Sequence, residues 1–356
     1  MRWKYAGILF LLLTFNACQN EEISLTRFED SPIIDSLLAS APHSVINTDI
    51  EVERLVATSR LGLTNDSLFL GSTSNMITIG DSVYISENMS THIFAVGTDG
   101  YLSRKIGKPG EAPGEFLYLD GLQYNGSNVF AKDQGRVQVF TEKFEYIDSF
   151  SDYGMTDRRF SVSPNYLFLK CPEKKWLVCA RSTSPPYDWD PDIKFLPSLD
   201  LSDRSGENGH LVTVSPEGDR IAMAYRGLPY IFVYDDQFRH LRTIRFEGSE
   251  VRNFNPIVGP PGGVPAGSME SGTRVFIATI KFINSRYLAA RVVSTINYIF
   301  DIDETAYDIR KVVFRPLNDV EERRDVAAAD FLLYQDQLYV SSSFEEYVYG
   351  YPFDLE

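Results

Sequence analysis

The chain has 356 residues and a formal net charge of −15 at pH 7. A chain this acidic repels phosphate backbones and anionic lipid headgroups, which excludes nucleic acid as an expected partner and membrane binding by surface charge. Its 20 tyrosines and 24 phenylalanines suit a fold built from β-strands, where aromatic side chains pack well.

Residues 1–17 are expected to direct export rather than to join the fold. Arg2 and Lys4 supply positive charge, and the apolar run at 6–15 is too short to span a bilayer. The run ends in Phe15-Asn16-Ala17-Cys18, which resembles a bacterial lipobox. This resemblance implies a signal peptide cleaved before Cys18 and a lipid anchor on the Cys18 sulfur and the new N-terminus. The alternative is an ordinary secretory signal that happens to be followed by a cysteine.

The residues after Cys18 indicate where in the cell the protein is located. Gln19-Asn20-Glu21-Glu22 is similar to the acidic tag that some Gram-negative lineages use to send lipoproteins to the outer surface. We therefore expect an outer membrane lipoprotein of the cell envelope, on the periplasmic or the external side, that contacts the membrane only through its lipid. Residues 18–47, with one apolar cluster at 32–38 that could form a helical turn, are expected to link the lipid to a domain at 48–356.

A repeated strand pattern fills the chain from about residue 50 to the C-terminus. Short β-runs recur at spacings of 44 to 67 residues and begin at Val83, Val129, Leu177, Ile221, Leu288 and Leu338. An all-β unit that repeats roughly every 40–50 residues is typical of a propeller blade of four antiparallel strands. The sequence therefore predicts an all-β fold, a six-bladed β-propeller, which by itself fixes no function.

Turn signals and the chain ends refine this prediction. Five of the six units contain a polar or glycine-containing pair that suits a tight hairpin, at 80–81, 126–127, 217–218, 284–285 and 335–336. In the third unit, the third and fourth strands cannot be assigned between residues 187 and 201. The last unit lacks an outer strand, and an open edge is an aggregation hazard. We predict that the spare N-terminal strand at 51–56 completes the last blade and closes the ring.

The connection between the first two units carries a family resemblance. Gly114-Glu115-Phe116 ends a glycine-rich connector, and a strand from Val129, then Asp133, Arg136 and a β-run ending at Phe140 follow it. This order resembles an NHL-type repeat, in which the Asp and the Arg tie the loop between the second and third strands. The other units lack the pair. The chain from about residue 50 onwards is similar to TolB-like, six-bladed propeller lipoproteins, which implies a fold and a location but no chemistry.

No constellation in the sequence indicates catalysis or metal binding. No Gly-x-Ser-x-Gly motif is present, and the connector at 107–116 lacks the Lys-Ser/Thr pair of a phosphate loop. The alternating carboxylates at 188–192 lack the glycine and the distal glutamate of an EF-hand, so a solvated acidic loop is the simpler interpretation. No zinc-ligand spacing joins the four histidines, which are His43, His92, His210 and His240. We expect no cofactor and no metal.

Two cysteines remain once Cys18 is assigned to the lipid. Cys171 and Cys179 flank a short hairpin, in a compartment where a disulfide could persist. The expected turn at Glu173-Lys174 does not place them directly opposite each other. The sequence therefore leaves open whether they are bonded.

Long loops indicate where a partner could bind. In antiparallel blades, the loops between second and third strands emerge on the same face as the connections between blades. We expect the segments 107–116, 182–209 and 248–272 on this face, where long loops on a rigid scaffold often carry function, although tolerated insertion is the alternative. The candidate contacts are Tyr187 and Trp189, with Arg136, Arg226 and Glu345 nearer the axis. For Arg136, bracing of its own loop is the alternative role.

Two functions remain. The first is a lipid-anchored, non-catalytic binding or scaffold module for a protein or glycan partner. The second is a polysaccharide hydrolase or lyase with its site in the axial funnel, which would need converging carboxylates or a Tyr/His pair. Carboxylates or a metal near the axis would favour the enzyme, and an aromatic-lined, uncharged surface would favour the binding module.

Overall fold

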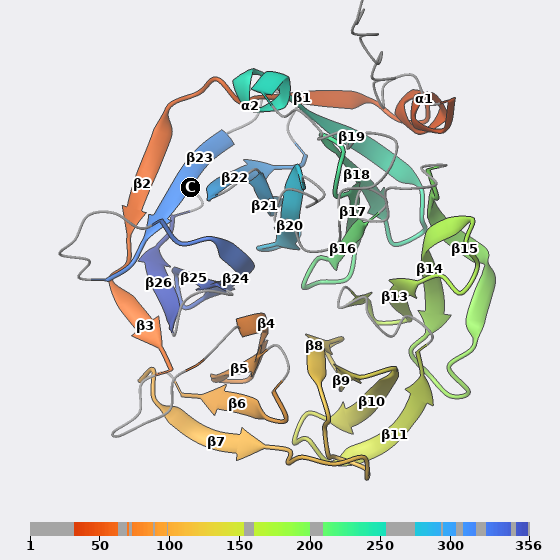
Figure 1. The fold of residues 1–356 in the computed structure, drawn as a ribbon, viewed down its shortest axis with the longest axis vertical. Coiled ribbons are helices and arrows are strands. Elements are labelled where there is room, and N and C mark those ends of the chain that lie inside the picture. The colour runs from red at the N-terminus through yellow and green to blue at the C-terminus, as the bar shows by residue number, and fades with distance from the viewer. Residues whose placement is uncertain are drawn as a thin grey trace, which may run out of the picture.

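The computed structural model describes residues 32–354 apart from 63–69, 71–72, 88–89, 98, 153–159, 200–208, 254–274, 293–294, 304–308, 318–324 and 343–346. Within these residues the strands form six sheets, each built on four antiparallel strands and arranged around a ring (Figure 1). Each sheet is one blade, and its first strand lies nearest the centre of the ring. The predicted six-bladed β-propeller is confirmed.

The blades follow one another in chain order. Blade one contains β4 (Thr73–Ile79), β5 (Ser82–Glu87), β6 (Ile93–Val96) and β7 (Leu102–Ile106). Blade two contains β8 (Leu119–Tyr124), β9 (Asn128–Asp133), β10 (Arg136–Thr141) and β11 (Tyr146–Ser151). Blade three contains β12 (Ser161–Val162), β13 (Tyr166–Lys170), β14 (Trp176–Ser182) and β15 (Trp189–Pro197). Blade four contains β16 (His210–Val214), β17 (Arg220–Tyr225), β18 (Tyr230–Asp235) and β19 (His240–Glu247). Blade five contains β20 (Ile277–Phe282), β21 (Tyr287–Val292), β22 (Ile296–Asp301) and β23 (Ile309–Arg315). Blade six contains β24 (Ala328–Tyr334), β25 (Gln337–Ser342), β26 (Val348–Pro352) and β3 (Ser59–Leu61).

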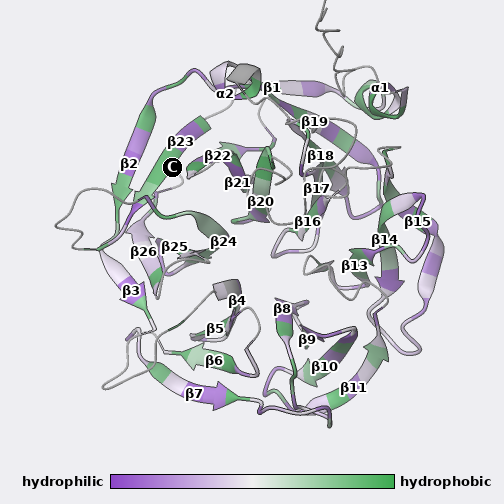
Figure 2. Cartoon of the chain, in the orientation of Figure 1, coloured by the Kyte–Doolittle hydropathy of each residue, from purple (hydrophilic) through white to green (hydrophobic). Residues whose placement is uncertain are grey.

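The apolar core lies between neighbouring blades rather than at the axis. Each pair of adjacent blades encloses one cluster of buried side chains, as where blades four and five bury Phe246, Phe276 and Phe300 together. The outer strands are more hydrophilic, as β7 and β2 show in purple in Figure 2. Large aromatic rings fill the wedge between blades that diverge outwards, which accounts for the aromatic-rich composition.

An N-terminal belt, residues 32–61, runs along the outside of blades four, five and six (Figure 1). It contains α1 (Pro32–Ala39), β1 (His43–Asn47), β2 (Val52–Val56) and β3. The part of the expected linker that the structure describes therefore packs on the ring, with Ile34 fully buried between blades three and four. The helical turn expected at 32–38 is confirmed as α1.

The ring is closed by an N-terminal strand, but by a different one from that predicted. The expected closing strand, 51–56, becomes β2, which pairs in parallel with β23 as a fifth strand of blade five. The closing strand is β3, which pairs antiparallel with β26. With only three residues, β3 is too short to produce an alternating pattern in the sequence. The longer β2 does produce one, but it lies on the outer edge of blade five, which is complete without it.

A buried ion pair fastens the belt to blade five. The Lys311 ammonium contacts Glu250 of α2 (Ser249–Asn253) and donates a 2.7 Å hydrogen bond to the carbonyl of Thr48, between β1 and β2. Burial opposes ionisation of Glu250, but the hydrogen bonds from Lys311 and Thr48 prevail and lower its pKa. The turn of the belt between blades four and five is thus held by charge inside the protein.

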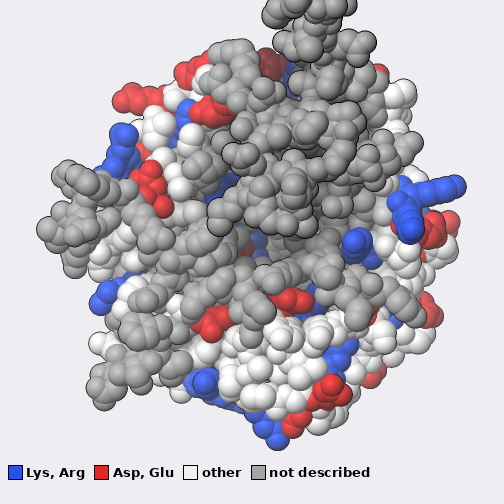
Figure 3. Space-filling model, viewed as in Figure 1, with Lys and Arg blue, Asp and Glu red and all other residues white. Residues whose placement is uncertain are grey.

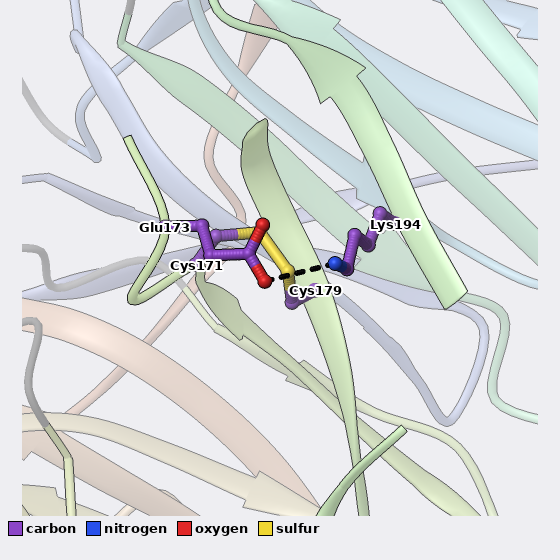
Figure 4. Close-up of a disulfide and its surroundings, with 4 residues drawn as sticks. All are labelled: Cys171, Glu173, Cys179 and Lys194. Atoms are coloured by element: carbon purple, nitrogen blue, oxygen red, sulfur yellow. Dashed lines mark hydrogen bonds and ion pairs between the residues drawn. A yellow bond between two sulfur atoms is a disulfide. The ribbon is translucent and has the colours of Figure 1, made fainter. Parts of the chain in front are cut away.

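The strand order in blade three differs from the one expected from the sequence. The sequence pattern placed the run at Leu177 second in its blade, but it lies in β14, the third strand. The first strand, β12, has two residues and gives no periodic signal. Cys171 and Cys179 therefore close the hairpin between the second and third strands, and they form a disulfide (Figure 4).

The disulfide lies diagonally across this hairpin. In the strand register Cys179 lies opposite Leu169, so the two cysteines are not directly opposite each other, as the expected turn position predicted. The Cα atoms of Cys171 and Cys179 are nevertheless only 4.9 Å apart. At the same hairpin, the Glu173 carboxylate forms an ion pair with the Lys194 ammonium of β15, with 2.9 Å between the oxygen and the nitrogen (Figure 4). The tip is therefore fixed both within its hairpin and to the outer strand.

Strand order defines two faces of the ring. The connector face carries the connections between blades and the loops between second and third strands, such as 107–118 and 171–175. The turn face carries the other two sets of turns, such as 125–127 and 183–188.

Candidate functional site

The most central recess is an axial pocket of about 240 Å³. All six first strands or their immediate neighbours contribute to its wall, including Thr73, Gln123, Ser161, Thr213, Thr279 and Asp330. Most of these residues lie in the first half of strands that start at the connector face. The pocket therefore lies toward that face.

A repeated β-bulge shapes this pocket. In four blades the pairing of the first with the second strand skips one residue near the start of the first strand, and the skipped positions are residue 74, Asp120, Ala278 and Ala329. A bulge bends its strand and redirects the side chain of the extra residue. Asp120, Ala278 and Ala329 line the axial pocket, so the bulges place these residues at the axis.

Charged groups of both signs line the axial pocket. Asp330 of β24 lies 3.5 Å from the Lys281 ammonium and accepts a 2.8 Å hydrogen bond from the backbone N–H of Met76. Burial raises the pKa of Asp330, although Lys281 and the backbone donors act against the shift. Arg291 of β21 is also in the wall, and burial lowers its pKa. Asp120, almost fully buried, brings a second carboxylate from blade two.

None of these four charged residues was predicted from the sequence. A charge inside an otherwise apolar inner strand, such as Asp330 in the run from Ala328 to Leu333, is the signal that could have identified one of them. The signal is weak, because the sequence does not show which strands lie innermost or where a bulge redirects a side chain.

Arg136 braces its own connector. Its Nε and Nη2 groups both donate to one carboxylate oxygen of Asp133, at 3.0 and 2.9 Å, and its guanidinium also donates to the carbonyls of Glu111 and Glu115. The other carboxylate oxygen of Asp133 accepts the N–H groups of Leu117 and Tyr118. This is the Asp–Arg tie that the NHL-like pattern implied, and it gives Arg136 a structural role on the connector face.

Arg226 also lies on the connector face, between β17 and β18. Its carbonyl accepts hydrogen bonds from the N–H groups of Phe276 and Ile277, which join blade four to the start of β20. Glu345, Cys18 and the larger part of the segment 248–272 lie outside the described residues. The expected binding and lipid attachment at these positions remain predictions.

Tyr187 and Trp189 occupy the opposite face from the one expected. Because β14 is the third strand of blade three, the loop at 183–188 joins third to fourth strand and belongs to the turn face. Only the later part of 182–209 connects blades, so this loop does not share a face with the connector at 248–272. The strand assignment in blade three caused this error.

Tyr187 points into the protein. Its ring is 3 % exposed and stacks on Phe150 with 4.7 Å between centroids, and its carbonyl accepts a hydrogen bond from Arg181. Burial, followed by the charge of Asp148, raises its pKa. Trp189 remains partly exposed, and the Arg181 guanidinium lies 5.4 Å from its ring centroid. Tyr187 thus anchors the loop, and Trp189 presents the available aromatic surface.

In the described part of the chain, no group of three or more His, Cys, Asp or Glu side chains is placed to hold a metal ion. None of the described helices is long and apolar enough to cross a membrane. Acidic and basic side chains are interspersed around the described rim of the face drawn in Figure 3.

Residues 61–151, which run from the last residue of β3 to the end of β11, match the family model DUF5128, described as a 6-bladed beta-propeller. The chain is a six-bladed propeller. Among curated proteins, none matches it.

Solved structures repeat the fold. The structure of U3-55K aligns over 83 % of this chain and 98 % of its own, at 9 % identity and a TM-score of 0.51. The RRP9 WD40 repeats align over 85 % and 99 %, at 10 % identity and a TM-score of 0.51. A putative exported protein from Bacteroides fragilis aligns over 84 % and 88 %, at 11 % identity and a TM-score of 0.47. At these identities the first two alignments show a similar fold and nothing further.

Proposed function

We propose that the protein is a non-catalytic binding module of the cell envelope, held to the outer membrane by a lipid on Cys18, and that a protein or glycan partner docks on its connector face. The observation that carries the proposal is the axial pocket. Six blades contribute to one recess on that face, its wall contains polar and charged groups, and the bulge residues of three blades line it. Such convergence on a rigid ring favours recognition of a partner's protruding group.

The size of the pocket supports binding rather than processing of a polymer. Its volume of about 240 Å³ lies below the roughly 300–1,000 Å³ typical of ligand pockets, so it suits one side chain or one sugar unit of a larger partner. Its buried Asp330 is already committed to Lys281 and to a backbone donor. The rest of the partner would then contact the surrounding connectors.

The disulfide supports the location. Structural disulfides persist in exported proteins and are rare in the reducing cytosol, and Cys171 and Cys179 are bonded. Cys18→Ala tests the anchor directly, since it should abolish labelling by a fatty-acid probe and release the protein from membranes. Retention of that variant in the membrane fraction would contradict the lipoprotein assignment.

Filling the pocket tests the binding face. Ala329→Trp places a large side chain at a bulge in the axial wall, whereas Arg104→Trp adds the same side chain to the exposed outer strand β7. Screening the full-length protein against a glycan array and envelope proteins should give a partner that binds the wild type and Arg104→Trp and fails to bind Ala329→Trp. A partner that binds all three proteins equally would place recognition away from the axis.

One observation favours the enzyme as a second candidate. Asp120 and Asp330 line the same axial pocket, and burial raises the pKa of Asp330 in the direction that a general acid needs. Polysaccharide cleavage by the wild type that is lost in Asp120→Asn would establish this function. Cleavage products that form equally with both proteins would come from a contaminant and would leave the binding function standing.

A further inference from the structure

A second recess lies on the turn face of blade three, away from the axial pocket. We name it the Trp189 groove. It has a volume of about 410 Å³, and its wall includes Asn165, Tyr166, Ser182, Asp188, Trp189 and Asp190. It adjoins a smaller hollow of about 160 Å³ that reaches blade four and shares Asn165 and Tyr166 with it. The volume of the groove falls within the usual range for ligand sites, roughly 300–1,000 Å³.

The groove is held in one shape before any ligand arrives. Tyr187 anchors the loop by its buried stack on Phe150, and Arg181 lies over both Phe150 and Trp189, at 4.2 and 5.4 Å from their ring centroids. Thr183 joins this loop to the turn between β12 and β13, because its hydroxyl donates to the Pro164 carbonyl at 2.8 Å and its backbone N–H donates to the Asn165 carbonyl at 3.0 Å. A preorganised site binds more tightly because less conformational entropy is lost on binding.

The two aromatic residues suit a flat, weakly polar partner. Tyr166 packs edge-on against Phe238 with centroids 5.3 Å apart, and both Tyr166 and Trp189 are partly exposed. The electron-rich face of such a ring attracts partly positive C–H groups, which line the faces of a pyranose ring. In the wall of the same groove, the carboxylates of Asp188 and Asp190 and the Ser182 hydroxyl can accept hydrogen bonds from sugar hydroxyls.

The charge of the groove selects among saccharides. Its wall contains the carboxylates of Asp188 and Asp190 and no lysine, arginine or histidine, so anionic sugars and phosphates are repelled. The Arg181 guanidinium, which lies 5.4 Å from the Trp189 ring centroid, offsets part of this negative charge and competes for the ring, so a cationic peptide gains less than the two carboxylates alone would give it. An uncharged ligand with many hydroxyl groups fits both restrictions.

We propose that the Trp189 groove is a carbohydrate-binding site for a neutral oligosaccharide, independent of the axial pocket and on the opposite face of the ring. Trp189 provides the stacking surface, Tyr166 continues it toward blade four, and Asp188 and Asp190 accept hydrogen bonds from hydroxyl groups. Two adjoining hollows indicate room for more than one sugar unit.

The tryptophan content makes a direct test possible. The chain has three tryptophans, Trp3, Trp176 and Trp189, so a full-length protein with Trp3→Phe and Trp176→Phe has Trp189 as its sole tryptophan. Its fluorescence is measured in detergent with neutral tetrasaccharides of glucose, mannose and N-acetylglucosamine. A tetragalacturonate and a tetralysine serve as charged probes. At least one neutral probe should change the emission saturably, and the charged probes should not.

Calorimetry with Trp189→Ala and Trp176→Ala provides the matched comparison. Trp176 starts the neighbouring strand β14 at the connector face, so its removal should leave affinity for the neutral probe unchanged, whereas removal of Trp189, at the start of β15, should weaken it at least about tenfold. Both variants should keep the wild-type melting temperature within a few degrees.

Three results would overturn the proposal. They are equal binding by both alanine variants, preferential binding of tetralysine, or unchanged Trp189 emission with every neutral probe up to roughly 10 mM, where even millimolar dissociation constants are detected. A failure of this site would leave the connector-face function untouched, because that function is tested by Ala329→Trp.

Discussion

The seam between β3 and β26 closes the ring with three residue pairs, so a proline in β3 should open it. The pairs join Ser59, Arg60 and Leu61 to the last strand of blade six. Arg60→Pro removes a backbone N–H at the middle of β3 and is incompatible with a regular ladder at that position. Leu61, the next residue, is 4 % exposed in the core between blades six and one and would be displaced with it.

The expected cost follows from these contacts. Loss of a ladder hydrogen bond removes about 0.5–1.5 kcal/mol, and exposure of a buried leucine removes about 1.5–3 kcal/mol, so the free energy of unfolding should fall by roughly 2–4 kcal/mol. With an unfolding entropy of about 2.1 cal/mol/K per residue over the ring and its belt, this lowers the melting temperature by about 3–6 °C.

The matched control is Arg60→Ala, which removes the cation–π contact with Tyr347 but keeps the backbone N–H. Differential scanning calorimetry should place its melting temperature close to the wild type. Hydrogen exchange at 348–352 should accelerate in Arg60→Pro alone, because β26 becomes an edge strand. If both variants melt alike and exchange alike, β3 does not hold the ring closed.

Gly350 tests the same seam from the other strand. A Cβ at this position would lie 2.2 Å from the Ser59 hydroxyl oxygen and 2.8 Å from the Tyr339 ring, so Gly350→Ala should push β3 away and destabilise the fold by about 1–3 kcal/mol. Ser59→Gly in the same chain removes the closest contact and should restore part of the loss. Equal stability of Gly350→Ala and the double variant would show that Ser59 is not the obstacle.

Three further predictions concern buried charge, the disulfide and pH. Lys132 and Asp152 form a 2.6 Å ion pair with both side chains fully buried. Lys132→Met leaves a buried charge unpaired, so it should lower the free energy of unfolding, measured in urea, by about 3–5 kcal/mol. The double variant Lys132→Met with Asp152→Leu should recover most of this loss, and a double variant that is equally unstable would contradict the prediction. Cys171→Ser should lower stability by about 2–3 kcal/mol under oxidising conditions, and a reductant should then change the wild type but not the variant. Although burial acts against it, hydrogen bonds from Arg239 lower the pKa of Asp235, so its stabilisation is complete above its unfolded value of about 4 and is lost as the pH falls through the folded value. Asp235→Asn should therefore lower the melting temperature at pH 7 more than at pH 3, and an equal effect at both values would refute the assignment.

The sequence by itself determined the repeated unit and the fold. Alternating apolar residues and short polar turns fix strands locally, so the hairpins at 80–81 and 335–336 could be located without a structure. The Asp133–Arg136 tie was also readable, because a brace between neighbouring residues needs only local spacing. The fold thus follows from interactions that are close in sequence.

Tertiary structure alone decided the closure, the faces and the pockets. β3 closes the ring by pairing with residues almost 300 positions away, and a strand of three residues is too short for its pairing to be predicted from the sequence pattern. Trp189 changed face because a two-residue first strand shifted the strand count in blade three, and each added strand reverses the direction of the chain. The charges at the axis come from strands of different blades, and the side chain of Asp120 points there because a bulge interrupts the alternation that sequence patterns assume.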